Sequence, residues 1–211
     1  MAANNINQPE IYYHIGDLPD DVSFDGDIAI DTETQGLNLS RDRLCVVQIS
    51  EGDGSAHLVH FPTPDFDAPN LKRELSKPDT VKIFHFGRFD IAAVEKYLGV
   101  ICRPVFCTKI ASKLTRTYTD RHGLKDLCRE LLGVELSKEQ QSSDWAAPEL
   151  SVAQQAYAAS DVLYLHALRD ALIERLQRED RLAIAKACYD FLPDRASLDL
   201  AGWEELDIFA H

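Results

Sequence analysis

The sequence is short of positive charge. Lysine and arginine together number 22, against 35 aspartates and glutamates, which gives a formal net charge of −13 at pH 7. Proteins that grip long nucleic acids usually carry a basic face, because phosphate contacts dominate that affinity. The composition therefore argues against extended nucleic-acid binding. It leaves room for a pocket that takes the end of a short strand, and it suits a protein that concentrates cations.

Other features are missing as well. No apolar run reaches 18 residues, so we expect no membrane span. The opening segment, MAANNINQPEIYYH, lacks a basic stretch followed by an apolar core, so we do not expect a secretory signal. The five cysteines are scattered, and Cys102 and Cys107 have no second close pair to complete a zinc site. This pattern favours reduced thiols in a cytoplasmic protein.

The apolar pattern predicts one α/β domain with a mixed sheet. A chain of 211 residues with 45% hydrophobic content can bury one full core. Apolar, β-branched runs predict strands, the first three as an antiparallel meander, at 28–30, 44–49, 57–61, 81–86 and 103–107. Helical patterns cover 70–77, 90–98, the segment up to Leu114, 123–133 with Gly133 as C-cap, and one long helix from Ser151 toward Arg178. Strands first and strand–helix alternation later are typical of this fold class.

The C-terminal segment differs from the rest. We expect a domain over 1–190 and a tail over 191–211. The tail is acidic but carries seven large apolar side chains: Leu192, Leu198, Leu200, Trp203, Leu206, Ile208 and Phe209. That is too apolar for a solvated tail, so we expect it to pack on the domain or on a neighbouring subunit.

The stretch DIAIDTETQGL (27–37) places two acids at the end of a predicted buried strand. Asp31 and Glu33 are two residues apart, and positions i and i+2 of a strand share one face. A turn or capping role would be ordinary for an Asp-Thr pair. Like charges this close resist burial, however, unless a positive charge lies between them.

Two further acids lie where apolar residues are expected. Asp90 follows the fourth strand, where it is either a helix N-cap or a site residue at the carboxyl edge of the sheet. Asp161 interrupts an apolar helix face, and Tyr157 lies one turn before it on that face. Carboxylate oxygens are the ligands that Mg²⁺ and Mn²⁺ prefer. We therefore predict two divalent cations, which together can clamp the attacking and leaving oxygens of a phosphodiester.

The segments DTE (31–33), HFGRFD (85–90) and YAASD (157–161) resemble the three motifs of the DEDD exonuclease superfamily, tyrosine variant. The remainder of residues 10–180 is similar to ribonuclease D, notably LSKEQQSSDW (136–145) and YAASDVLYL (157–165). The resemblance implies a ribonuclease-H-like mixed sheet flanked by helices. It also implies a metal-dependent 3′→5′ exonuclease that releases 5′-mononucleotides.

The resemblance also implies roles for individual residues. Asp31, Glu33 and Asp161 would hold the metal that carries the attacking water, Asp31 and Asp90 would hold the second, and Tyr157 would orient the water. Substrate contacts are expected from six residues: Thr32, Gly36, Leu37, His85, Arg88 and Trp145. The alternative for His85 is a packed or backbone-bonded histidine, and Trp145 has a packing role as its alternative. Arg88 is otherwise a solvated helix residue or an intersubunit contact. Lys138 and Gln141 stay open.

The expected substrate depends on which branch the chain resembles more. Ribonuclease D carries helical RNA-binding domains after its nuclease, whereas this sequence holds residues 181–211 there and shows no basic patch. The compact acidic form is more similar to the nanoRNase C group, which acts on very short single-stranded RNAs, including dinucleotides, and forms closed rings of subunits. A homo-oligomer is therefore expected. The alternatives are processing of longer RNA such as tRNA precursors, a DNA-directed exonuclease, and an inactive RNA-binding module.

Overall fold

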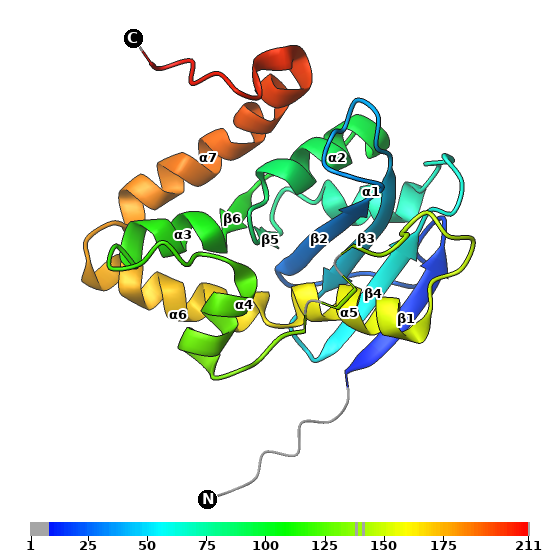
Figure 1. Cartoon of the computed structure of the whole chain (residues 1–211), viewed down its shortest axis with the longest axis horizontal. Helices are drawn as coiled ribbons and strands as arrows, with labels where there is room; N and C mark the ends of the chain where they lie inside the picture. The colour runs from blue at the N-terminus through cyan, green and yellow to red at the C-terminus, as the bar shows by residue number, and fades with distance from the viewer. Residues whose placement is uncertain (1–8, 138, 141, 211) are drawn as a thin grey trace, which may run out of the picture.

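The computed structural model describes residues 9–137, 139–140 and 142–210. Its centre is a six-stranded mixed sheet with the strand order β1-β4-β3-β2-β5-β6 (Figure 1). The strands are β1 (Glu10–Ile15), β2 (Ile28–Thr34), β3 (Leu44–Ser50), β4 (Ser55–His60), β5 (Lys82–Phe84) and β6 (Val105–Cys107). The predicted antiparallel meander of β2, β3 and β4 is confirmed.

The sequence pattern does not predict strand β1. Its sequence, EIYYHI, has an apolar run of only three residues between Glu10 and His14, and the strand is only partly buried. It lies parallel to β4 at the edge of the sheet and is held there by long-range pairing.

Seven helices surround the sheet in the described part of the chain. They are α1 (Pro69–Leu75), α2 (Arg88–Leu98), α3 (Thr108–Thr115), α4 (Leu124–Leu127), α5 (Val152–Leu163), α6 (Leu165–Arg178) and α7 (Leu182–Leu198). In Figure 1, α5 crosses one face of the sheet, and α1 and α2 lie behind it. The core fills both interfaces, with the apolar residues of β2 and β3 completely buried. None of these helices is both long enough and apolar enough to cross a membrane.

The long helix predicted from Ser151 to Arg178 is wrong in one respect. The chain bends at Tyr164, which separates α5 from α6. No glycine or proline marks the break, and the apolar period continues through it. The bend follows from packing, because α5 covers the sheet whereas α6 packs against α3. The N-cap at Ser151 is confirmed, and Gln154 completes a capping box with it.

The segment predicted as a helix over 123–133 has a composite form. Helix α4 continues into a π-helical turn, η1 (Cys128–Leu132), and Gly133 ends it in the left-handed conformation with φ +70°. The predicted C-cap is therefore confirmed, because a side chain is disfavoured at this φ.

The C-terminal segment begins inside a helix. The boundary expected at 190/191 falls within α7, and a second π-helical turn, η2 (Asp199–Trp203), follows it. Leu192 is buried against the core, whereas Trp203, Leu206, Ile208 and Phe209 are between 44% and 70% exposed. The end of the chain projects from the body of the molecule (Figure 1). The tail therefore packs on its own domain only over its first part.

Candidate active site

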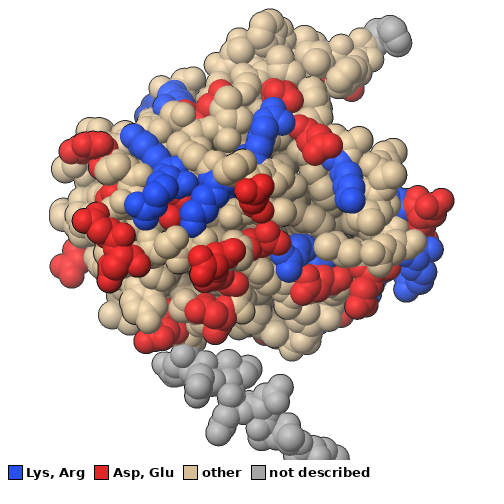
Figure 2. Space-filling view, turned by 180° about the vertical axis from the view of Figure 1, so that it is seen from behind, with Lys and Arg blue, Asp and Glu red and all other residues tan. Residues whose placement is uncertain are grey.

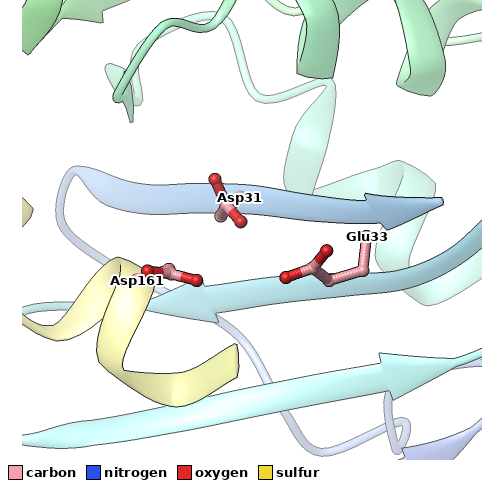
Figure 3. Close-up of side chains that lie close together, drawn as sticks. All are labelled: Asp31, Glu33 and Asp161. Carbon is pink, nitrogen blue, oxygen red and sulfur yellow. The ribbon is translucent and has the colours of Figure 1, made fainter. Parts of the chain in front are cut away.

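Three carboxylates meet at the face of the sheet that α5 covers. Asp31 and Glu33 extend from β2, and Asp161 approaches them from α5 (Figure 3). One carboxylate oxygen from each residue lies within 4.8 Å of the others. The two-residue spacing on β2 and the helix above it thus produce the cluster that the sequence predicts.

Asp90 reaches the same region from the first turn of α2. Strand β2 extends beyond the short strand β5, so its backbone has no strand partner on that side past Ala29. The Asp90 Oδ1 atom takes that place, accepting hydrogen bonds from the Thr32 amide at 3.1 Å and from the Thr32 hydroxyl at 2.6 Å. Asp90 is therefore fastened to β2 one residue from Asp31, in agreement with its predicted position.

The four acids are held in an environment that disfavours their charged forms. Burial, followed by the charges of the neighbouring acids, raises the pKa of Asp31 well above its usual range and that of Glu33 to about 9. Burial also raises the pKa values of Asp90 and Asp161 to about 7, although hydrogen bonds from Thr32 and Tyr157 oppose this. Each pKa reports the same physical fact, which is negative charge crowded together away from bulk water.

No described lysine or arginine forms an ion pair with any of these four acids. Carboxylate oxygens that are not ion-paired with lysine or arginine suit a hard divalent cation, which would offset the repulsion between them. The residues present therefore fit the predicted metal site.

Tyr157 lies one turn before Asp161 on α5, which places both side chains on one face of the helix. Burial and the neighbouring negative charges raise the pKa of the Tyr157 phenol far above its ordinary value. Its ring packs against Trp145, with 6.0 Å between the ring centroids. The phenol is therefore neutral near neutral pH and its ring is packed, which is compatible with the predicted role in orienting water.

The cluster lies in a cavity of about 940 Å³, which also brings together five of the six predicted substrate contacts: Thr32, Gly36, Leu37, His85 and Trp145. Leu37 is 87% exposed, an unusual position for a large apolar side chain. The loop that carries it is braced, since Asp42 accepts a hydrogen bond from the Asn38 amide at 3.1 Å. A side chain at Gly36 would collide with the Asp42 carboxylate, so glycine is needed there.

His85 is placed at the cavity as a neutral acceptor. Its Nδ1 atom lies 2.9 Å from the Thr108 hydroxyl, which donates its own hydrogen to the Phe84 carbonyl at 3.2 Å. The Nδ1 atom must therefore carry the ring hydrogen, which leaves Nε2 as an acceptor. Burial and the nearby Lys109 lower the pKa of His85 to about 3. An acceptor at Nε2 suits a hydroxyl group as its partner and does not suit an ionised phosphate oxygen, which has no hydrogen to donate.

The structure takes Arg88 away from the cavity. Its guanidinium donates to both carboxylate oxygens of Asp199, at 2.5 and 2.7 Å, and to the Glu204 carbonyl at 2.6 Å. It therefore ties α2 to the C-terminal segment in this chain. Trp145 is 2% exposed, so it forms a packed wall of the site. Lys138 and Gln141 lie outside the described residues.

Sequence reasoning missed the cations of the cavity. Lys109 and Lys125 both line it, and the Lys109 ammonium lies 3.7 Å from the centre of the Phe86 ring. Phe86 adopts a φ of +62°, a conformation that is strained for an aromatic residue. The rule that placed Asp90 after β5 would have found Lys109, which follows the carboxyl end of β6 by two residues.

The sequence matches the family model described as 3′-5′ exonuclease over residues 15–177. The chain belongs to the 3′–5′ exonuclease family, DEDD type. It is 33% identical to the ribonuclease D of Gluconacetobacter diazotrophicus over 186 residues, which cover 85% of this chain and 46% of that protein. The chain thus spans about half the length of the curated relatives it matches.

The solved structures of two other proteins are similar to this exonuclease domain. Brucella melitensis NrnC has 59% sequence identity and a TM-score of 0.92, and the match covers 96% of this chain and 98% of that one. NrnC structures with bound Mg²⁺ and bound to pGG are similarly close, at 58% identity. Escherichia coli RNase D has 25% identity and a TM-score of 0.71, with 82% of this chain and 45% of that one covered. The predicted ribonuclease-H-like fold is confirmed.

Proposed function

We propose that this chain is a metal-dependent 3′→5′ exoribonuclease that hydrolyses very short RNAs, dinucleotides among them, to 5′-mononucleotides. The observation that carries the proposal is the cluster of Asp31, Glu33, Asp90 and Asp161, with which no described lysine or arginine forms an ion pair. The likeness to NrnC over nearly its whole length, including a form bound to pGG, supports the short substrate.

Two divalent cations, Mg²⁺ or Mn²⁺, would supply the positive charge that activates water and stabilises the leaving oxygen. Asp31, Glu33 and Asp161 would hold one of them, and Asp31 with Asp90 the other. The NrnC structure with bound Mg²⁺ supports a divalent cation as the cofactor. Removal of the cations should therefore abolish turnover while leaving the sheet intact.

The chain's own residues position the reactants. The neutral Tyr157 hydroxyl, one turn from Asp161, can orient a water molecule. Its raised pKa keeps it protonated near neutral pH, so it cannot act as a general base there. The exposed Leu37 side chain at the mouth of the cavity is suited to pack between the last two bases. The Nε2 atom of His85 is suited to accept a hydrogen bond from a substrate hydroxyl, and Thr32 and Gly36 shape the same wall.

Charge favours a short substrate. A long RNA approaching a chain with net charge −13 meets repulsion, which salt screens beyond a Debye length of about 8 Å. Figure 2, which shows the side opposite to Figure 1, has lysine and arginine side chains in short groups flanked by acidic ones. A dinucleotide needs few phosphate contacts, so its binding should depend weakly on salt concentration.

We further propose a cytoplasmic homo-oligomer in the form of a closed ring. The exposed apolar side chains Trp203, Leu206, Ile208 and Phe209 offer a contact surface for a neighbouring subunit. Four of the five cysteines are buried free thiols, as suits a reducing compartment.

The second candidate is processing of longer RNA. Relatives named ribonuclease D favour it, and the structure of E. coli RNase D is described as that of an exoribonuclease involved in structured RNA processing. A DNA-directed exonuclease is the third.

A length series of 5′-labelled RNAs, from two to about twenty nucleotides, separates these functions. We expect kcat/KM in Mg²⁺ and in Mn²⁺ to be higher for two to four nucleotides than for twenty, with the gap narrowing as salt rises. A DNA dinucleotide serves as the matched control, and light scattering gives the subunit number. Equal or greater efficiency on twenty-nucleotide RNA by a monomer would favour the processing function instead.

A further inference from the structure

One buried side chain beside the active site lacks the partners that its chemistry requires. Gln48 lies in β3 and is fully buried, yet neither its amide nitrogen nor its amide oxygen has a hydrogen-bond partner among the described residues. All the remaining residues of β3 are buried as well. A leucine or valine in place of Gln48 would avoid the free-energy cost of burying polar atoms that have no hydrogen-bond partner. An amide in this position therefore calls for a functional explanation.

The register of the sheet places Gln48 next to the carboxylates. Gln48 pairs directly with Asp31 of β2 across the antiparallel ladder, so the two side chains share one face. Its other neighbour, Leu58 of β4, packs with Val46, Ala158 and Trp145 under α5. The Gln48 amide thus lies on the α5 face, between the sheet and the helix that delivers Asp161.

The other buried glutamine of the described chain makes a useful contrast. Gln154 caps α5, where its side-chain oxygen accepts from the Ser151 amide and its side-chain nitrogen donates to the Asp144 carbonyl, at 3.0 and 3.1 Å. Its amide is satisfied within the protein and explains a helix start. Gln48 has no comparable use in the fold.

We propose that Gln48 is a positioning residue whose amide N–H groups hold the Asp31 carboxylate in the orientation that binds a divalent cation. An ionised carboxylate that ligates a cation keeps lone pairs that a neighbouring donor can satisfy, and a carboxylate so held does not rotate away from the cation. The proposal rests on the metal-dependent function proposed above. It concerns the ordering of one ligand and leaves the ligand set unchanged.

Binding of the metal alone tests the proposal without reference to turnover. In calorimetric titrations with Mg²⁺, Gln48→Met should bind about 10- to 100-fold more weakly than the wild type. In EDTA the same variant should melt at the wild-type temperature or above it, because an unpaired buried amide has been removed. Gln154→Met is the matched control, with a lower melting temperature in EDTA and unchanged Mg²⁺ affinity.

Turnover provides a second readout. The kcat of Gln48→Met on a dinucleotide should fall at limiting Mg²⁺ and recover with excess Mg²⁺. The proposal would be overturned if Gln48→Met bound Mg²⁺ as tightly as the wild type. It would also be overturned if the variant lost stability in EDTA together with its Mg²⁺ affinity, because the residue would then be structural. Gln48→Leu replaces the methionine variant if the latter does not fold. A wild-type protein that binds no Mg²⁺ would instead refute the proposed function itself.

Discussion

Glu74 and the acids of the candidate active site have opposite surroundings. Glu74 of α1 has no exposed surface, and it is bound by the Lys77 ammonium at 2.5 Å, the Arg73 guanidinium at 3.0 Å and the Phe24 amide at 3.0 Å. Asp31, Glu33 and Asp161 lie close to one another and to Asp90, and no ion pair among the described residues includes them. The charge of Glu74 is therefore compensated by cations of the chain, whereas no described ion pair compensates the charges of Asp31, Glu33 and Asp161.

The pKa values separate Glu74 from the cluster in the same way. Burial alone would raise the pKa of Glu74, but its contacts with Lys77, Phe24 and Arg73 outweigh burial and hold that pKa below its usual range. At the cluster, burial and mutual repulsion act together and raise the pKa values. Glu74 is therefore ion-paired within the fold, whereas the acids that we propose to bind metal form no ion pair with a described lysine or arginine.

The largest effect should come from the cluster. Asp31→Asn should reduce kcat/KM on a dinucleotide by at least about 10³-fold, since each cation contributes several kcal/mol to the transition state. Its metal-free melting temperature should equal or exceed that of the wild type, because one repelling charge is removed. Near wild-type turnover in Mg²⁺ by this variant would eliminate Asp31 as a ligand.

A smaller loss is expected at Tyr157. Tyr157→Phe removes only the hydroxyl, so kcat should fall by about 10²-fold while Mg²⁺ affinity by calorimetry stays unchanged. The phenylalanine keeps the contact with Trp145, which controls for packing. Loss of metal binding with turnover retained would assign Tyr157 to the ligand set and contradict its role in orienting water.

Glu74 should show the reverse pattern. Glu74→Gln removes a charged acceptor from two cations and one amide, so the free energy of unfolding should fall by about 1–3 kcal/mol. Its kcat/KM at a temperature where it is folded should match the wild type. Urea unfolding and dinucleotide assays check the two parts, with Asp170→Asn on the surface as control; a stable but inactive Glu74→Gln would break the comparison.

The smallest expected effect is a difference in pH dependence. The cluster's pKa values of about 7 to 9 exceed the unfolded values near 4, so its protonated form stabilises the metal-free fold fully below about pH 4. That stability is lost as the pH rises through the folded pKa values. For Glu74 the sign is opposite: its contribution is present above its unfolded pKa and is lost as the pH falls through the lowered folded pKa.

Melting temperatures in EDTA measure this difference. From pH 5 to pH 9 the wild type should lose more stability than Asp161→Asn, which has one titrating group fewer. Added Mg²⁺ should raise the wild-type melting temperature more at pH 8 than at pH 6, because protons compete for the carboxylates. Parallel curves for the two proteins would show that Asp161 does not titrate with the cluster.

Local pattern alone accounts for much of the site. The two-residue spacing of Asp31 and Glu33 puts both on one face of any strand, and the four-residue spacing of Tyr157 and Asp161 puts both on one face of any helix. The same holds for Gly133, whose left-handed conformation ends a helix whatever surrounds it. These features depend on backbone geometry within one element, which the sequence determines by itself.

Tertiary structure decided what depends on two elements meeting. Strand β1 forms because it pairs with β4 at the edge of the sheet. The chain bends at Tyr164 because α5 and α6 pack on different elements. The charge of Arg88 would suit either the active site or a position away from it. Its ion pair with Asp199, 111 residues later in the chain, holds it away from the cavity. Gln48 is one polar residue in an apolar strand until the register sets it against Asp31. Such contacts join residues that are remote in sequence, and their energies come from burial and pairing that no local period encodes.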